Sequence, residues 1–218
     1  MKKTYQGKKL FLCSSFADVA GLLNIFEKNL KGKIVTFIPT ASKVEKINFY
    51  VKDAKKELEK AGMIIDTLDI SQAEKSEIVK KIKNNDFIYV SGGNIFYLLQ
   101  EMKKTGADEI IVEEVNKGKL YIGESAGAMI VSENIKYAGL MDDGTEYISE
   151  LKNLNSLNLV DFYTVPHYGC FPFEESAEKT MNVYSSLNLV PITNNQAILV
   201  DEDKINVLEI KKQKLFSK

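Results

Sequence analysis

Short apolar runs alternate with longer amphipathic stretches along the first half of this chain. The apolar runs are almost uninterrupted, which is typical of strands in a sheet whose two faces are both covered by helices. Each amphipathic stretch repeats its apolar residues at helical spacing. We expect strands at 10–13, 34–38, 63–68, 87–90 and 120–122, and helices at 16–30, 44–60, 74–82, 95–103 and 108–116. This β-α-β order predicts a doubly wound, mostly parallel α/β sheet with right-handed crossovers.

The second half of the chain is less regular. Residues 132–160 are rich in Asn, Asp, Gly, Ser and Glu, and we expect excursions or hairpins there. Beyond them we expect a strand at 162–165, a helix at 174–187 and a terminal hairpin of strands 197–200 and 205–210. The chain has no linker, internal repeat or low-complexity tract. One α/β domain spanning residues 1–218 is therefore predicted.

Composition excludes several classes of protein. Lys and Arg together number 29 against 30 Asp and Glu, and every basic residue is a lysine. A net charge of −1 argues against a dedicated nucleic-acid-binding protein, which would carry a basic excess. Two cysteines, Cys13 and Cys170, are too few for a secreted disulfide framework and indicate a reducing cytoplasm. Asp18 interrupts what would be the apolar core of a signal peptide, and no run of 18 apolar residues predicts a membrane span.

The segment GESAGA (123–128) directly follows an expected strand and opens a short helix. It matches the G-x-S-x-G pattern of a nucleophile elbow in the strand–turn–helix context that the pattern requires. Gly123 and Gly127 leave room for a sharp turn that exposes the Ser125 hydroxyl, and the following helix supplies backbone N–H groups suited to an oxyanion. The alternative is an ordinary glycine-rich turn in which Ser125 caps a helix. We favour a nucleophilic serine.

A serine nucleophile needs a general base, and His167 is the chain's one histidine. It lies in VPHYGCF, just after the strand expected at 162–165. Sites in open α/β sheets assemble at the carboxyl ends of the strands, the edge where Ser125 also lies. A lone histidine is usually a surface or structural residue, but this placement favours a catalytic role. Cys170 is a conceivable thiol nucleophile without an elbow around it, and Cys13 is expected to be a small buried apolar residue.

The segment SGGN (91–94) also lies between an expected strand and an expected helix. Glycine pairs let the backbone approach a ligand closely and direct an N–H group toward it. A plain tight turn or a weak phosphate-binding loop would show the same pattern, but the glycine motifs of nucleotide-binding loops are absent from the sequence. We expect this loop to form half of an oxyanion hole and the Ala126 N–H group to form the other half.

Three segments carry a resemblance to a known family: YVSGGNIFYLLQ (89–100), KGKLYIGESAGAMI (117–130) and VPHYG (165–169). Through them nearly the whole chain resembles the dipeptidase E (aspartyl dipeptidase) family of serine peptidases, which is related to the cyanophycinases. The resemblance implies a flavodoxin-like α/β fold akin to that of class I glutamine amidotransferases, with serine at the elbow where those enzymes carry cysteine. It also implies that Ser125 is the nucleophile, that His167 is the base, and that Gly93 forms the oxyanion hole with Ala126.

The chain departs from the family's pattern at two points. The third triad member in the founding dipeptidase is acidic, and two positions of this chain correspond to places where the family carries it. One falls near 140–143, where Asp142 is the nearest acid. The other falls near 193–195, where Asn194 replaces a glutamate. An asparagine can orient an imidazole but stabilises an imidazolium less than a carboxylate does. The family's arginine for acidic substrates also has no counterpart, because Lys179 in the comparable helix offers only a point charge. Specificity for Asp-X dipeptides is therefore not expected.

The sequence as a whole predicts a cytoplasmic serine peptidase that hydrolyses dipeptides or small peptides through an acyl-enzyme on Ser125. No metal or cofactor is required, and neither a nucleic acid nor a membrane is an expected partner. A homodimer is a family-level expectation. Two alternatives remain open: a non-catalytic α/β binding module with a decayed site, and a small-molecule esterase or amidase. An α/β-hydrolase esterase is disfavoured because its histidine usually lies near the C-terminus, whereas a helix and two strands are expected after His167.

Overall fold

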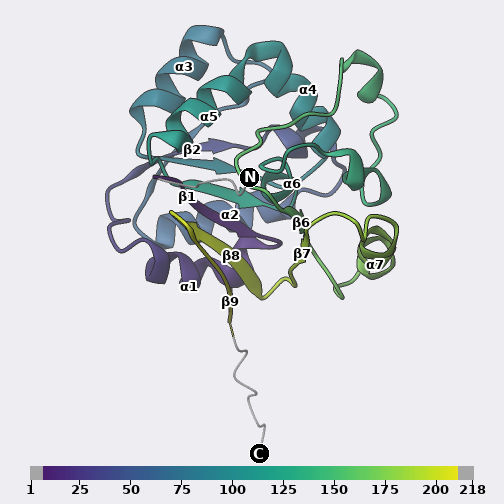
Figure 1. Ribbon diagram of the computed structural model, residues 1–218. Coiled ribbons are helices and arrows are strands. Elements are labelled where there is room, and N and C mark those ends of the chain that lie inside the picture. The colour runs from purple at the N-terminus through teal and green to yellow at the C-terminus, as the bar shows by residue number, and fades with distance from the viewer. Residues whose placement is uncertain (1–6, 211–218) are drawn as a thin grey trace, which may run out of the picture.

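A seven-stranded sheet runs through the molecule and carries helices on both faces (Figure 1). The structure, a computed structural model, describes residues 7–210, so residues 1–6 and 211–218 of the predicted domain lie outside the described residues. The strand order is β3-β2-β4-β5-β1-β8-β9. The strands are β1 (Lys9–Cys13), β2 (Ile34–Ile38), β3 (Ile64–Thr67), β4 (Phe87–Val90), β5 (Tyr121–Glu124), β8 (Gln196–Asp201) and β9 (Lys204–Glu209).

The five strands from β3 to β1 in this order are parallel, and β8 and β9 complete the sheet in antiparallel fashion. The predicted doubly wound, mostly parallel sheet and the terminal hairpin are thus confirmed. In register, Cys13 of β1 lies beside Glu124 of β5, and Val90 of β4 lies beside Gly123. The residues that follow these three strands therefore meet at one edge of the sheet.

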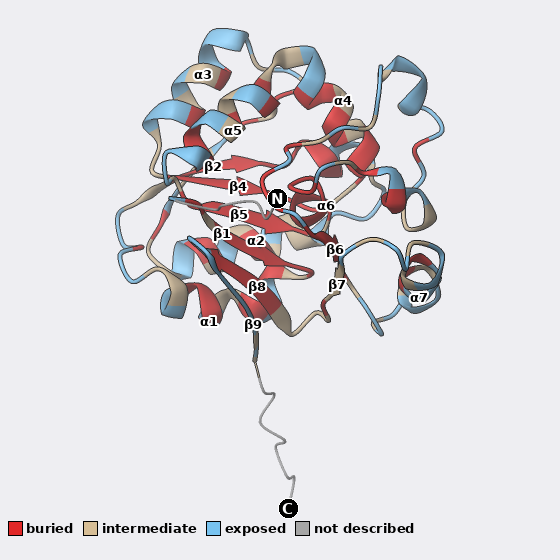
Figure 2. Cartoon of the chain, in the orientation of Figure 1, coloured by how far each residue is buried: buried red, intermediate tan, exposed pale blue. Residues whose placement is uncertain are grey.

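The core lies on both faces of the sheet, whose strands are mostly buried (Figure 2). Leu10 and Leu12 of β1 pack in the cluster under α3, α4 and α5, whereas Phe11 and Cys13 pack in the cluster under α1 and α2. This alternation is the period-2 pattern of a strand covered on both sides. The helices are α1 (Phe16–Phe26), α2 (Phe49–Lys60), α3 (Lys75–Asn84), α4 (Ile95–Thr105) and α5 (Ala107–Asn116).

Three expected helices are shorter than predicted; one of them, expected at 174–187, ends at Val183. The helix expected at 44–60 begins only at Phe49, and a 3₁₀ turn, η1 (Thr40–Val44), precedes it. The apolar residues Val44 and Ile47 in the expected first turns are exposed, and only Ala54 and Leu58 of α2 are buried. The helix expected at 16–30 ends at Phe26, because the Glu27 side chain accepts a hydrogen bond from the Asn29 N–H group and turns the chain.

The irregular segment 132–160 contains two short 3₁₀ helices, η2 (Lys136–Leu140) and η3 (Ile148–Glu150), and one isolated bridge between Asn134 and Asn155. The excursion prediction is confirmed, and the hairpin alternative is wrong. No helix among residues 7–210 is long and apolar enough to cross a membrane.

The strand expected at 162–165 does not join the large sheet. It is β6 (Tyr163–Val165), which pairs in parallel with β7 (Leu189–Pro191) in a separate two-stranded sheet, with α7 (Glu174–Val183) between them in sequence. The prediction that His167 follows a strand of the main sheet is therefore wrong. The pairing was missed because β7 is only three residues long and ends in Pro191, so its sequence carries little strand signal.

Candidate active site

Ser125 lies in a sharp turn between β5 and the short helix α6 (Ala126–Met129), at the carboxyl edge of the sheet. Its φ of 49° and ψ of −108° are strained for a residue with a Cβ atom, which is the expected backbone of a nucleophile elbow. The Ser125 N–H group donates to the Cys13 carbonyl at 2.8 Å and anchors the turn to β1. A Cβ atom at Gly127 would lie 2.1 Å from the Val90 carbonyl oxygen, so only glycine lets α6 approach β4 so closely.

His167 reaches the same edge from the loop after β6. Its Nε2 atom lies 3.1 Å from the Ser125 hydroxyl oxygen, at hydrogen-bonding distance. The His167 backbone has a positive φ of 60°, and its N–H group donates to the Ser14 hydroxyl at 3.0 Å. Ser14 in turn donates to the Ile192 carbonyl, and Phe173 stacks on the imidazole with a centroid distance of 4.7 Å. Ser14, which directly follows β1, thus holds the His167 backbone, and Phe173 at the start of α7 holds its ring, although β6 is outside the main sheet.

Asn194 contacts the other nitrogen of the imidazole. Its Oδ1 atom lies 2.7 Å from His167 Nδ1. Because an amide oxygen can only accept, this contact places the ring proton on Nδ1 and leaves Nε2 free to accept the Ser125 proton. Burial lowers the pKa of His167 below its ordinary value of 6.5, and the Asn194 hydrogen bond opposes that shift. The imidazole is therefore neutral at pH 7, as a general base must be.

Asp142, the other candidate for orienting the imidazole, lies elsewhere. It accepts hydrogen bonds from the Ile95 N–H group at 2.7 Å and from the Asn94 side chain at 3.1 Å, at the first turn of α4. Burial raises its pKa to about 6. Asp142 ties the excursion that contains it to the SGGN loop, and the structure brings Asn194 rather than Asp142 to His167. The physical reason is that the first-turn N–H groups of α4 attract a carboxylate.

Of the two expected oxyanion-hole residues, Ala126 directly follows Ser125, and Gly93 directly follows Gly92 in the SGGN loop. Gly93 has a φ of 128°, and a Cβ atom there would lie 2.2 Å from the Ala41 carbonyl oxygen, so the position requires glycine. Its neighbour Gly92 approaches the nucleophile itself, since a Cβ atom there would lie 3.2 Å from Ser125 Cβ. Ala126 is the first residue of α6, so its N–H group has no partner within that helix. Between residues 7 and 210, no hydrogen bond occupies the N–H group of Gly93 or Ala126.

Three further residues at this edge were not predicted from the sequence. Ser14 directly follows β1, and the rule that sites form after strand ends could have identified it. Glu124, the last residue of β5, is 3% exposed. Tyr50 of α2 packs against Gly92, and its hydroxyl group is buried without a hydrogen-bond partner among the described residues. Neither of the last two follows from a sequence pattern, because each contacts elements that are remote in the chain.

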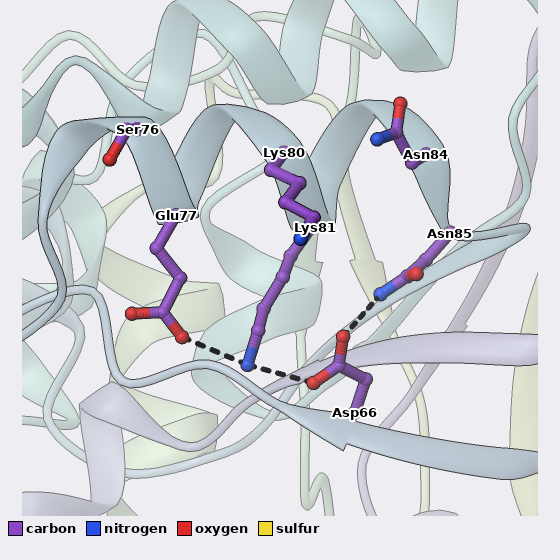
Figure 3. Close-up of a pocket in the computed structure, with 7 residues that line it drawn as sticks. All are labelled: Asp66, Ser76, Glu77, Lys80, Lys81, Asn84 and Asn85. Atoms are coloured by element: carbon purple, nitrogen blue, oxygen red, sulfur yellow. Dashed lines mark hydrogen bonds and ion pairs between the residues drawn. The ribbon is translucent and has the colours of Figure 1, made fainter.

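A pocket on α3 and β3 lies apart from this site (Figure 3). Lys81 bridges Asp66 and Glu77 at 2.7 and 3.0 Å, and Asn85 donates to Asp66. Asp66, Glu77 and Lys81 are therefore occupied by one another in an ion-pair network. In the described part of the chain, no cluster of three or more His, Cys, Asp or Glu side chains could hold a metal ion.

The family model described as "Peptidase family S51" matches residues 10–208 of the chain. An uncharacterized peptidase of Listeria monocytogenes, Lmo0363, is 53% identical over 194 residues, which cover 88% of this chain and 94% of that protein. An uncharacterized peptidase of Pasteurella multocida, PM1590, is 52% identical over 197 residues, covering 90% and 95% of the two chains. Peptidase E of Shewanella sp. (strain ANA-3) is 33% identical over 136 residues, which cover 61% of this chain and 56% of that protein.

Solved structures are similar to this one along nearly their whole lengths. A crystal structure from Listeria monocytogenes, assigned provisionally to peptidase E, superposes with a TM-score of 0.89 at 50% identity and covers 94% of this chain and 99% of the other. A peptidase from an acI-B1 Actinobacterium shares the fold, with a TM-score of 0.68 at 22% identity over 93% and 88% of the two chains. Since the family model spans nearly the whole chain and the predicted elbow lies within it, the chain belongs to peptidase family S51, the serine peptidases that include peptidase E.

Proposed function

We propose that this peptidase hydrolyses dipeptides or small peptides through an acyl-enzyme on Ser125. The observation that carries the proposal is the relay from Ser125 Oγ through the His167 imidazole to Asn194, with distances of 3.1 and 2.7 Å. A nucleophile, a base and an orienting group in this order are the requirements of serine catalysis, whatever fold presents them.

The proposed reaction has two halves. In the first, His167 Nε2 takes the Ser125 proton while Oγ attacks the peptide carbonyl, and the N–H groups of Gly93 and Ala126 stabilise the oxyanion. His167 then gives the proton to the leaving amine. In the second half a water molecule, deprotonated by His167, attacks the acyl-enzyme and releases the acid product. The neutral Asn194 fixes the tautomer of His167 but adds no negative charge to stabilise the imidazolium, which favours a modest rate for this enzyme.

Labelling with a fluorophosphonate tests this mechanism directly. We expect stoichiometric modification of the wild-type protein at Ser125, located by peptide mass mapping, and none in the Ser125→Ala variant. Product analysis on a dipeptide panel should show the two free amino acids. An unlabelled wild-type protein would instead indicate the non-catalytic binding module, and a labelled protein that cleaves p-nitrophenyl esters but no peptide would indicate an esterase.

Substrates with an acidic first residue are expected to be poor. Tyr50, which packs on Gly92 beside the nucleophile, lies in the electrostatic field of Glu45, Glu124 and Asp142. These carboxylates disfavour a substrate carboxylate, and the chain has no arginine to bind one.

The matched pair Asp-Leu and Asn-Leu isolates the charge, because the two dipeptides have nearly the same shape. We expect kcat/KM for Asp-Leu to be at least about 10-fold lower, which corresponds to about 1.4 kcal/mol. Lys179 is exposed on α7, so the Lys179→Ala variant should keep the same ratio. Faster cleavage of Asp-Leu than of Asn-Leu by the wild-type enzyme would contradict this prediction.

A further inference from the structure

The residue before the nucleophile carries a buried carboxyl group that has no role in the mechanism above. Glu124 immediately precedes Ser125 and is 3% exposed. Its Oε1 atom accepts a hydrogen bond from the Phe16 N–H group at 2.8 Å, and its Oε2 atom accepts one from the Tyr89 hydroxyl at 2.8 Å. The nearby backbone N–H group of Gly92 also favours its ionised form. A single buried side chain of β5 is thus hydrogen-bonded to the start of α1 and to β4, and it interacts electrostatically with the SGGN loop.

Two of these contacts bear on the geometry of the site. Phe16 opens α1, whose N-cap residue Ser15 makes no side-chain cap, so Glu124 satisfies a first-turn N–H group that would otherwise be unpaired. Gly92 precedes Gly93, whose N–H group belongs to the proposed oxyanion hole, and it approaches the Ser125 side chain closely. The attraction between the Glu124 carboxylate and the Gly92 N–H group therefore bears on where the Gly93 N–H group lies relative to the nucleophile.

The contacts suit a carboxylate better than a carboxylic acid. The backbone N–H groups of Phe16 and Gly92 cannot accept a hydrogen bond, so an acid O–H group or a glutamine NH₂ group could donate only to the Tyr89 hydroxyl, which would have to turn from donor to acceptor. Protonation also removes the negative charge that attracts the two N–H groups, so it weakens both interactions.

We propose that Glu124 is a positioning residue for the hydrolytic reaction, whose ionised carboxylate holds the SGGN loop in place for transition-state stabilisation and whose protonation releases it. The proposal rests on the serine mechanism proposed above. Glu124 touches neither Ser125 Oγ nor His167 in any recorded hydrogen bond between described residues, so it acts through the loop.

The surroundings of Glu124 bring its titration into the working range of the enzyme. Burial raises its pKa to about 7, and the hydrogen bonds from Phe16 and Tyr89 and the nearby Gly92 N–H group oppose that shift. The titratable groups that interact with it are Asp18 of α1, Cys13 of β1, Tyr89 of β4 and Tyr50 of α2. Burial raises the pKa values of Cys13 and both tyrosines, so these three stay neutral at pH 7. The negative charge of Asp18 adds to the upward shift.

The pH profile of the wild-type enzyme is the first test. Because His167 must be neutral and Glu124 ionised, kcat/KM should fall as the pH drops through about 7. Below the lowered pKa of His167 both groups are protonated, so kcat/KM should fall more steeply with pH there. The loss near pH 7 should appear in kcat with little change in KM, since the oxyanion forms only in the transition state. A single inflection below pH 6.5 in the wild-type profile would overturn the proposal without any variant.

The Glu124→Gln variant is the second test. We expect kcat about 100-fold lower at pH 8, the loss typical of a misplaced transition-state contact, and a profile that lacks the inflection near pH 7. Glu124→Asp keeps the charge and should restore part of kcat together with the inflection. Glu114 of α5 is the matched control, because it is also a buried glutamate but forms ion pairs with Lys117 and Lys119, which follow that helix. Glu114→Gln should keep the wild-type profile.

The outcomes separate this proposal from the mechanism on which it rests. If fluorophosphonate labels wild-type Ser125 but Glu124→Gln keeps the wild-type kcat and the inflection near pH 7, the positioning role is wrong and the serine mechanism stands. If wild-type Ser125 is not labelled, the mechanism itself fails. Circular dichroism and thermal unfolding of each variant show whether a loss of activity reflects a loss of fold.

Discussion

Replacement of His167 by alanine is expected to lower kcat for peptide hydrolysis by about 10⁵- to 10⁶-fold, the loss seen when the base of a serine triad is removed. His167 lies 3.1 Å from Ser125 Oγ and is the chain's one histidine, so no second imidazole can replace it. Steady-state kinetics of the purified variant measures the loss. Residual activity above about 1% of wild type would require a different base.

The Ser125→Ala variant and the double variant test whether Ser125 and His167 act as one unit. Ser125→Ala should lose about as much activity as His167→Ala, and the double variant should lose no more than either single variant, because the base is useless without its nucleophile. Lys179→Ala, exposed on α7, serves as the control with wild-type activity. Additive losses in the double variant would contradict a shared proton-transfer step.

The elbow could be predicted because its signal is local. Ser125, Gly127 and the strand before them are contiguous in sequence, and the strained turn needs only those residues and a neighbouring strand. The parallel sheet was predictable for the same reason, since each buried strand and each covering helix carries its own periodicity. His167 was found by a different route, because a chain with one histidine leaves one imidazole base to consider.

The remaining parts of the site depend on contacts between distant segments. Glu124 reaches Phe16 and Tyr89 across 108 and 35 residues of sequence, and no spacing rule connects them. The pairing of β6 with β7 is likewise a tertiary event between two three-residue strands. For the same reason the sequence could name Asn194 and Asp142 only as alternatives. The structure separates them, because the Asp142 carboxylate accepts a hydrogen bond from the Ile95 N–H group at the first turn of α4.

The second large loss of activity is expected for the Asn194→Ala variant. The Asn194→Ala variant removes the acceptor 2.7 Å from His167 Nδ1, so the imidazole can rotate or take the tautomer with its proton on Nε2. We expect kcat to fall about 10²- to 10³-fold, less than when a triad carboxylate is lost, since Asn194 carries no charge. The adjacent Asn195 makes no recorded side-chain contact with His167 among the described residues, so Asn195→Ala is the matched control. Wild-type kcat in Asn194→Ala would exclude an orienting role.

The Asn194→Asp variant tests the same contact by strengthening it, because it replaces a neutral acceptor with a charged one. A carboxylate beside Nδ1 stabilises the imidazolium, so the pKa of His167 should rise from its lowered wild-type value. His167 is then neutral only at higher pH. The pKa that His167 contributes to the fall of kcat/KM at low pH should therefore be higher than in the wild-type enzyme. NMR titration of the imidazole resonances follows this group alone, because the chain contains one histidine. If the His167 pKa in Asn194→Asp equals or falls below the wild-type value, the side chain at position 194 does not contact the imidazole in solution, and its place in the relay is wrong.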